Sequence, residues 1–397
     1  MKALLSNLKI LDFTTLLPGP FATMYLADLG ADVLRIESPS RPDLIRLMPP
    51  YVDENKKISC FHSYLNRNKK SIALDLKHKD SFVIIERLVK TYDVIVEQFR
   101  PGAMERLGLS YKRLSAINSK IIYCSLTGYG QNGPLSNRAG HDINFMSLSG
   151  IMSYSGKKEC GPNLMGIQIA DISGSYNTAI SILAALINRM GAGKGQYIDV
   201  SMLDCLFPYH AISAIKELCG EAKVGYETEL LNGGSLYDFY ETADGEYLSF
   251  GGLEAKFFER FCDVLGIEEL KEGGITQLSK LSDSKKKVVD LIRSKPRDYW
   301  IQKFKAADVC VEPILSFREA IDTDHAKERG LLVEVPCSQN ENVTQIAHPV
   351  KYSDFKPVYK RCGAKLGEDT FEVMRSLGFS NDEIRNFKEK GVLGQDE

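Results

Sequence analysis

The sequence lacks an excess of charge of either sign. Its 397 residues include 50 Lys and Arg against 52 Asp and Glu, so the formal net charge is -2 and the pI is near 6.4. Nucleic acids and anionic membranes attract proteins through a basic surface, and this composition supports neither partner. An anionic ligand must instead be bound by a few local basic side chains.

Long apolar runs are also lacking. No uninterrupted apolar segment reaches the roughly 18 residues that span a bilayer. Asp12 interrupts the short apolar run near the start, and no small-residue cleavage site follows it. We therefore expect no signal peptide, no transmembrane segment and a cytoplasmic location.

Several motifs of cofactor and metal sites are missing. The nine cysteines are scattered singly, without a C-x-x-C pair or a histidine at zinc spacing. This pattern is typical of reduced thiols and predicts no metal site. The chain also has neither G-x-G-x-x-G nor a Walker sequence, so those devices for binding nucleotide phosphates are excluded.

Strand-like and helical patterns alternate along the first part of the chain. This alternation predicts an α/β fold with a parallel sheet that helices cover on both faces. Ligands of such sheets bind beyond the carboxyl ends of the strands, where "ESPS", "EQFRPG" and "TGYGQNGP" fall. The strands are expected at residues 8–13, 31–37, 70–76, 93–99 and 120–130.

The length predicts two domains, because it exceeds the usual size of one core. Near residue 225 the pattern changes to hairpin-like runs with turn glycines. We expect a large domain over 1–200 that 330–397 completes, a linker helix over 201–224, and a smaller α+β domain over 225–329.

Four side chains are candidates for catalysis, and each has a purely structural alternative. His141 and Asp142 in "AGHDINF" fit either a general base beside an acid or the start of a helix that Asp142 caps. Asp171 fits the N-cap of a helix over 171–189. Glu254 fits the first turn of another helix, where the macrodipole favours an acid.

Several of these segments together resemble the CaiB/BaiF superfamily of acyl-CoA enzymes, which contains the class III CoA-transferases and the α-methylacyl-CoA racemases. The resemblance runs in order from about residue 4 to about residue 355. It implies a Rossmann-like large domain, a small domain, and an interlocked homodimer that acts on an acyl-CoA substrate without a further cofactor. The segments that carry it are "ADLGADVLRIESPS", "NRNKKSIALDLK", "EQFRPGAMERLGL", "YCSLTGYGQNGP", "AGHDINF", "GKGQYIDVSMLD" and "LYDFYETADGEYLSFGGLEAKFF".

The racemase branch is the one that the chain resembles more closely. In those enzymes two bases move the Cα proton of an acyl-CoA from one face to the other. The resemblance implies His141 and Asp171 as this pair, with Glu254 supporting the histidine and Asp142 near the second base. The intact "GHDIN" and the glutamate of "GGLEAKFF" favour this branch.

The transferase branch is the alternative. There an aspartate at the position of Asp171 attacks the acyl-CoA, and CoA passes to another carboxylic acid through an aspartyl anhydride and an aspartyl-CoA thioester. The run "NLMGIQIADISGSY" is closer to the transferase pattern. A CoA-binding protein without chemistry is a third hypothesis, and the sequence does not name the acyl group.

The resemblance also implies where CoA binds. Its adenine and phosphates belong near the loops that follow the early strands, where Arg35, Arg67, Lys69 and Arg100 are the candidate contacts. Taken alone, the basic residues of "NRNKK" and "QFRPG" are equally typical of solvated surface charges. In relatives a basic residue commonly follows "RIE" or "RID", and in this chain Ser38 occupies that position.

Overall fold

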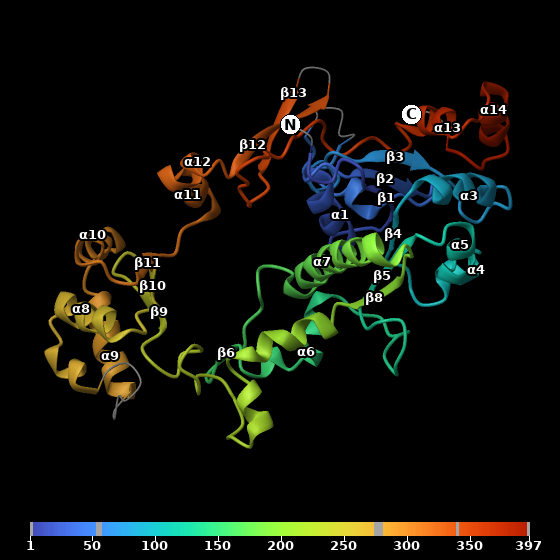
Figure 1. Ribbon diagram of the computed structural model, residues 1–397. Coiled ribbons are helices and arrows are strands. Elements are labelled where there is room, and N and C mark those ends of the chain that lie inside the picture. Colours follow the sequence, from blue (N-terminus) through green and yellow to red (C-terminus); the bar gives the residue numbers. More distant parts are fainter. Residues whose placement is uncertain (1–2, 53–57, 274–280, 339–340, 395–397) are drawn as a thin grey trace. The chain divides into compact units, whose positions relative to one another are not determined.

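The computed structural model describes residues 3–52, 58–273, 281–338 and 341–394 (Figure 1). The chain forms two compact units, and each is made of separate pieces of sequence. Unit 1 consists of Met1–Phe145, Ile167–Leu206 and His325–Glu397, and unit 2 of Met146–Gly166 and Phe207–Asp324.

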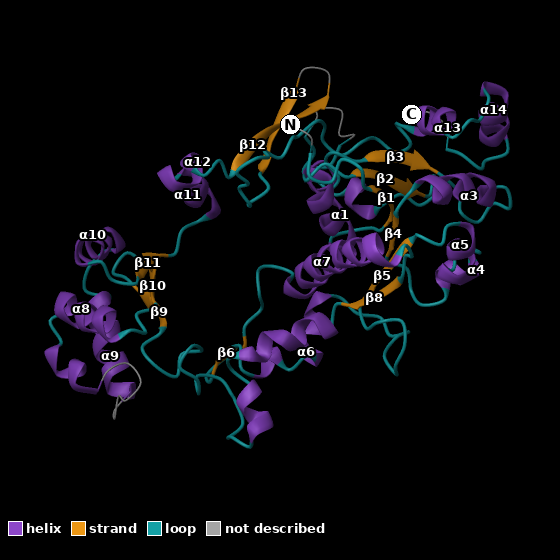
Figure 2. Ribbon diagram, in the orientation of Figure 1, coloured by secondary structure: helices purple, strands orange, loops and turns teal. Residues whose placement is uncertain are grey.

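Unit 1 is built on a six-stranded sheet in which every pair of neighbouring strands is parallel (Figure 2). The order is β3-β2-β1-β4-β5-β8, so the direction of winding reverses between β1 and β4. Such a reversal leaves a crevice at the carboxyl ends of the two strands, where ligands of α/β sheets bind. The prediction of a parallel sheet is confirmed. The strands are β1 (Lys9–Phe13), β2 (Asp32–Glu37), β3 (Lys70–Ala73), β4 (Val94–Glu97), β5 (Ile122–Thr127) and β8 (Tyr197–Ser201).

Helices pack against the sheet because alternate strand residues point to opposite faces. Leu11 and Phe13 of β1 join an apolar cluster with α3, α5, α13 and α14. Asp12, between them, contacts α1, which packs along α7. The helices of unit 1 are α1 (Pro18–Asp28), α2 (Cys60–Leu65), α3 (Ser81–Thr91), α4 (Ala103–Arg106), α5 (Tyr111–Ile117), α7 (Ile169–Ala192), α13 (Thr370–Ser376) and α14 (Asn381–Glu389), while α6 (Asp142–Leu148) and α12 (Asp324–Glu328) cross unit boundaries.

A network of buried charges lies on the face of the sheet that α1 covers. The ammonium group of Lys69 donates to Asp12, Thr23 and Asn66 over 2.8–3.3 Å. Burial lowers the pKa of Lys69 to about 7, although Asp12 opposes that shift. The neighbouring guanidinium group of Arg35 pairs with Asp43 at 3.0 Å and also with Glu37. Buried charges are tolerated only when they are paired in this way.

A second buried pair links the N-terminal part of unit 1 to its C-terminal part. Arg67 pairs with Asp28 at 2.6 Å and donates to the carbonyl oxygen of Ile346, also over 2.6 Å. Ile346 ends the hairpin of β12 (Leu332–Ser338) and β13 (Glu341–Ile346). The C-terminal segment is therefore an integral part of unit 1.

Unit 2 contains a three-stranded antiparallel sheet in the order β11-β10-β9. Phe250 of β10 stacks on Phe261 of α8 with ring centroids 3.8 Å apart, inside an apolar cluster that also includes Trp300 of α10. The elements are β6 (Gly156–Lys157), β7 (Gly161–Pro162), β9 (Asp238–Glu241), β10 (Tyr247–Phe250), β11 (Val311–Pro313), α8 (Ala255–Leu265), α9 (Leu281–Ile292), α10 (Arg297–Ala307) and α11 (Phe317–Asp322).

The segment expected to be one linker helix differs from the prediction. Residues 201–224 contain two 3-10 helices, Asp204–Ala211 and Ile215–Cys219. Pro208 lies inside the first of them, and a proline there removes a backbone donor and clashes with the preceding turn of an α-helix. Residues 146–166, expected in the large domain, belong to unit 2.

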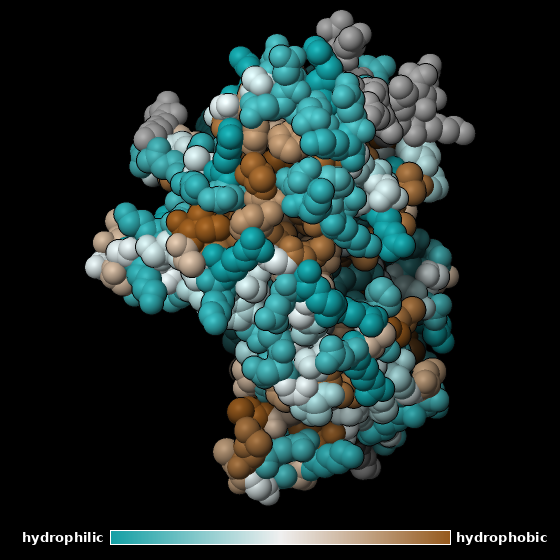
Figure 3. Space-filling view, turned by 90° about the vertical axis from the view of Figure 1, so that its right-hand side faces the viewer, coloured by the Kyte–Doolittle hydropathy of each residue, from teal (hydrophilic) through white to brown (hydrophobic). Residues whose placement is uncertain are grey.

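Within the described residues, no helix combines the length and the apolar character needed to cross a membrane. Apolar residues are nevertheless exposed at several points among hydrophilic ones on the face drawn in Figure 3.

The Asp28–Arg67 pair gives a stability prediction. Asp28→Ala leaves a buried guanidinium without its carboxylate, and we expect unit 1 to lose about 3–5 kcal/mol, seen as a lower midpoint of thermal unfolding. Lys90→Ala is the control, because Lys90 forms only an exposed pair with Glu86 at 2.7 Å, and its midpoint should not change measurably. Equal midpoints for the two variants would contradict the role given to the buried pair.

Candidate active site

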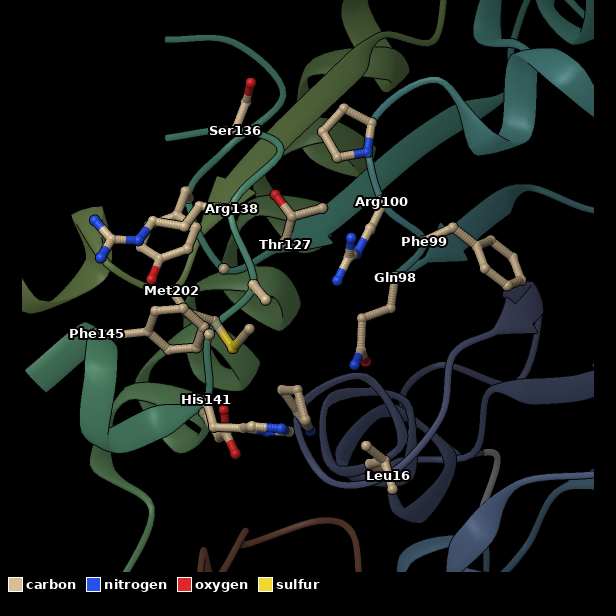
Figure 4. A pocket seen from close by; sticks show the side chains of 17 residues that line it. Leu16, Gln98, Phe99, Arg100, Thr127, Ser136, Arg138, His141, Phe145 and Met202 are labelled. Carbon is tan, nitrogen blue, oxygen red and sulfur yellow. The ribbon is translucent and has the colours of Figure 1, made fainter. Parts of the chain in front are cut away.

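A pocket of about 310 Å³ lies at the carboxyl edge of the sheet in unit 1. Leu16 and Pro18, which follow β1, line it together with Gln98 and Arg100, which follow β4 (Figure 4). The pocket therefore occupies the crevice where the winding of the sheet reverses. Two of the three loops expected to carry chemistry, those after β4 and β5, contribute to it.

The loop after β4 is held by two hydrogen bonds. The buried carboxylate of Glu97 accepts one from the amide of Phe99 over 2.8 Å, and the side-chain oxygen of Gln98 accepts one from the amide of Gly19 over 3.1 Å. Burial raises the pKa of Glu97 to about 7. The second bond ties the loop that carries Arg100 to the start of α1.

His141 starts a helix and lines the pocket at the same time. Its backbone amide donates to the side chain of Asn144 over 3.0 Å, and its carbonyl oxygen accepts from the amide of Asn144 over 2.8 Å. Gly140 precedes it because a Cβ there would lie 2.5 Å from the hydroxyl oxygen of Tyr129. A helix does begin at "AGHDINF", but Asp142 is the first residue of α6 and not its cap, so that part of the prediction was wrong. His141, directly before α6, lines the pocket.

Asp171 lines the same pocket, but it is not the N-cap of its helix. α7 begins at Ile169 after Gln168, so Asp171 lies in the first turn. The cap is a tertiary one: a carboxylate oxygen of Asp142 accepts from the amides of Ala170 over 2.6 Å and Asp171 over 3.2 Å. The prediction that Asp171 caps the helix was wrong because this partner comes from a distant part of the chain.

The two aspartates are electrostatically linked. Burial raises the pKa of Asp171 to about 7, and the negative charge of Asp142 adds to that shift. Burial also raises the pKa of Asp142, while its bonds to the two amides oppose the change. Near neutral pH, Asp171 therefore exists in both protonation states, as a group that accepts and returns a proton requires.

Glu254 lies in unit 2, where it is the exposed N-cap residue of α8 and makes no capping hydrogen bond through its side chain. It is not among the residues that line the pocket of unit 1. Its support of His141 stays a prediction. Unit 2 also contains a pocket of about 790 Å³ with a more apolar lining, and none of the four candidate catalytic residues contributes to it.

Three of the four predicted phosphate contacts are corrected. The side chains of Arg35, Arg67 and Lys69 are each only 1% exposed and are bound to internal partners, which leaves no surface for a phosphate. They are not solvated surface charges either. Arg100, the fourth, is exposed and lines the pocket.

Arg138 is a pocket residue that no motif in the sequence singled out. It is exposed, lines the pocket and approaches from a different segment than Arg100 (Figure 4). The available signal was its position in the glycine-bounded loop three residues before His141.

A family model, related sequences and a solved structure all relate this chain to one family of CoA enzymes. A family model described as CoA-transferase family III matches residues 5–370. Human α-methylacyl-CoA racemase is 34% identical over 395 residues, which cover 98% of this chain and 97% of that protein. A succinate–glutarate CoA-transferase from Agrobacterium fabrum is 32% identical over 384 residues, 94% of this chain and 95% of that one. The crystal structure of a CaiB/BaiF family protein from Brucella suis superimposes with a TM-score of 0.83 at 28% identity and covers 95% of this chain and 100% of that chain.

The raised pKa of Asp171 predicts a pH-dependent stability. The unfolded chain releases this proton near pH 3.8, whereas the folded protein holds it to about pH 7. Stability from this group is therefore complete below pH 3.8 and is lost as the pH rises through 7. Asp171→Asn removes the loss, so its melting temperature should exceed that of the parent by a few degrees at pH 8 and by less at pH 5. Glu389→Gln, a change at an exposed residue of unit 1, is the control, and a pH-independent gain for Asp171→Asn would contradict the assignment.

Proposed function

Because this chain belongs to CoA-transferase family III, we propose that it is an acyl-CoA racemase that inverts Cα of a 2-methyl-branched acyl-CoA. One observation carries the proposal. His141 and Asp171 come from different elements and line one pocket, and the pKa of Asp171 is raised to about 7. An imidazole and a carboxyl group that titrates near neutrality, both at one pocket, suit the two ends of a proton transfer.

In the proposed reaction, one of the two groups takes the proton from Cα. The electron pair of the broken C–H bond moves toward the thioester oxygen and forms an enolate. The other group then gives a proton to the opposite face of Cα, and the thioester is restored. The resemblance to the superfamily assigns Glu254 to support the histidine. Burial, together with the negative charge of Asp142, disfavours the anion of Asp171 and so favours the protonated carboxyl group that the return step needs.

The basic side chains at the pocket support an acyl-CoA as substrate. Arg100 and Arg138 line the pocket and are exposed, so their guanidinium groups are available to phosphate oxygens. We propose these two residues as contacts of the CoA phosphates. CoA enters as part of the substrate, and catalysis needs no further cofactor.

A CoA-transferase is the alternative, and one observation favours it. Asp171 lines the pocket from the first turn of a long helix, which places a carboxyl group, the nucleophile of covalent carboxylate catalysis, where an acyl-CoA would bind. In that reaction the carboxylate attacks the thioester carbonyl, and the CoA thiolate leaves an acyl-aspartyl anhydride. The thiolate then attacks the aspartyl carbonyl, which releases the first acid and forms an aspartyl-CoA thioester. A second carboxylate attacks this thioester and expels CoA, and CoA attacks the acyl carbonyl of the new anhydride, which gives the new acyl-CoA and restores the aspartate.

We further propose a homodimer in the cytoplasm. Apolar side chains recur along one side of α7, where Ile180 is 63% and Ile187 is 70% exposed. Contiguous exposed apolar surface is typical of an interface. An interlocked arrangement is what the resemblance to the superfamily implies.

Deuterium exchange separates the activities. With a 2-methylacyl-CoA in D2O and no acceptor acid, we expect the enzyme to place deuterium at Cα. His141→Ala should lower the rate of racemisation by about 10²–10⁴, and His325→Ala, a change at an exposed histidine, should leave it unchanged.

The same assay has outcomes that contradict the proposal. If Cα gains no deuterium, while a free carboxylic acid accepts CoA and Asp171 gains the mass of an acyl or CoA adduct, the enzyme is a transferase. If neither exchange occurs with acyl-CoA bound, the chain is a binding protein.

The two arginines predict a change in substrate affinity. Arg138→Ala and Arg100→Ala should each raise KM for the acyl-CoA by about tenfold, because a charge-assisted bond to phosphate is lost, while kcat changes little. Lys194→Ala, at a lysine beyond the far end of α7, is the control. A fall in kcat with unchanged KM would contradict their role as phosphate contacts.

A further inference from the structure

A second concave site of unit 1 lies away from the residues discussed above. It is a pocket of about 390 Å³ between the end of α12 and the chain that follows β13. The backbone amide of Ala347 donates to Leu331 over 2.8 Å, and the ammonium group of Lys351 donates to the carbonyl oxygen of Gly330 over 3.3 Å. Both walls of the pocket are therefore connected within one unit.

His348 at this pocket is buried, and its imidazole lacks hydrogen bonds, although its backbone amide donates to the hydroxyl oxygen of Tyr359 over 2.8 Å. The residue is 2% exposed, and neither of its ring nitrogens has a hydrogen-bond partner in the described part of the chain. Its Nδ1 lies 4.0 Å from a carboxylate oxygen of Asp28, too far for a hydrogen bond, and Asp28 is already paired with Arg67 at 2.6 Å. Buried polar groups in native proteins nearly always have partners, so this imidazole points to a ligand.

The rest of the lining indicates the chemistry of that ligand. The charged residues of the lining are three basic ones, Arg329, Lys351 and Lys356, and one acidic one, Glu328. Most of the remaining lining is apolar or aromatic. The ring centroid of His348 lies 4.6 Å from that of Tyr25 and 6.3 Å from that of Tyr352. The remaining wall residues are Gly330, Val333, Ala347, Val350, Phe355, Pro357 and Tyr359.

We propose that this pocket binds a small monocarboxylate with an aromatic or aliphatic body. A ring N–H of His348 donates to the carboxylate, the basic side chains offset its charge, and the apolar walls contact its body. The volume suits a compact organic acid, since small-molecule pockets begin at about 300 Å³. The site is separate from the pocket of His141 and shares no lining residue with it, so the proposal does not depend on the racemase assignment.

Benzoate is the probe, and benzamide is its uncharged analogue. In full-length protein labelled with 15N in histidine, the His348 ring signal is the one of six that His348→Gln removes. We expect benzoate to shift this signal and to bind about tenfold more tightly than benzamide, because a charge-assisted bond is gained. His348→Phe should weaken benzoate binding by about tenfold or more as measured by calorimetry.

Surface variants keep the test valid if His348→Phe does not fold. Lys351→Ala and Arg329→Ala should each weaken benzoate binding several-fold, whereas Lys360→Ala, an exposed neighbour outside the lining, should not. Arg100→Ala removes a cation of the other pocket and should leave the shift of the His348 signal intact. The proposal is overturned if benzoate leaves that signal unmoved, if benzamide binds equally well, or if the signal responds only to protein concentration, which would mean that a second copy covers the pocket.

Discussion

The pairing of buried charges is the constraint on which unit 1 depends. Asp12 and Arg35 project from neighbouring strands into a face that α1 closes, and Lys69 reaches them from the segment before β3. Each group removed from water needs its partners in place, so the strands, α1 and the chain between β2 and β3 must adopt one mutual arrangement. That arrangement fixes the position of β1, and the loop that follows β1 lines the pocket of His141. The shape of the pocket therefore depends in part on ion pairs whose members do not line it.

At the pocket itself, two carboxyl groups that repel each other as anions, those of Asp142 and Asp171, lie close together. Asp142 satisfies the free amides at the start of α7 and in doing so brings its carboxylate next to that of Asp171. The capping bonds stabilise the helix, while the proximity destabilises the second anion. A single side chain thus holds the backbone and tunes an acid. His141 lies directly before Asp142 in sequence, so the same helix start positions both ends of the proposed proton transfer.

The sequence predicts the repetitive parts of this structure well, because strand and helix periodicity are local. Strands β1 to β5 of the parallel sheet and the hairpin-like region that contains β9 and β10 were anticipated near their observed places. His141 and Asp171, predicted as a pair, line one pocket, and their catalytic roles stay a prediction. The failures are tertiary. The basic residues of "NRNKK" are typical of solvated surface charges or of phosphate contacts. Arg67 and Lys69 are instead buried, because partners from β1, α1 and the C-terminal segment surround them. Likewise, nothing next to Asp171 shows that a residue 29 positions earlier supplies the cap of its helix.

The hydrogen bond between Arg67 and Ile346 has a consequence for how the chain folds during synthesis on the ribosome. The N-terminal strands are synthesised first, but Ile346, whose carbonyl oxygen accepts a hydrogen bond from Arg67, is added almost 280 residues later. All of unit 2 is synthesised in between, since its last residue is Asp324. Unit 2 can therefore complete its fold while polar groups of unit 1 are still unpaired. Unit 1 begins first in the chain but is the second of the two units to complete its fold.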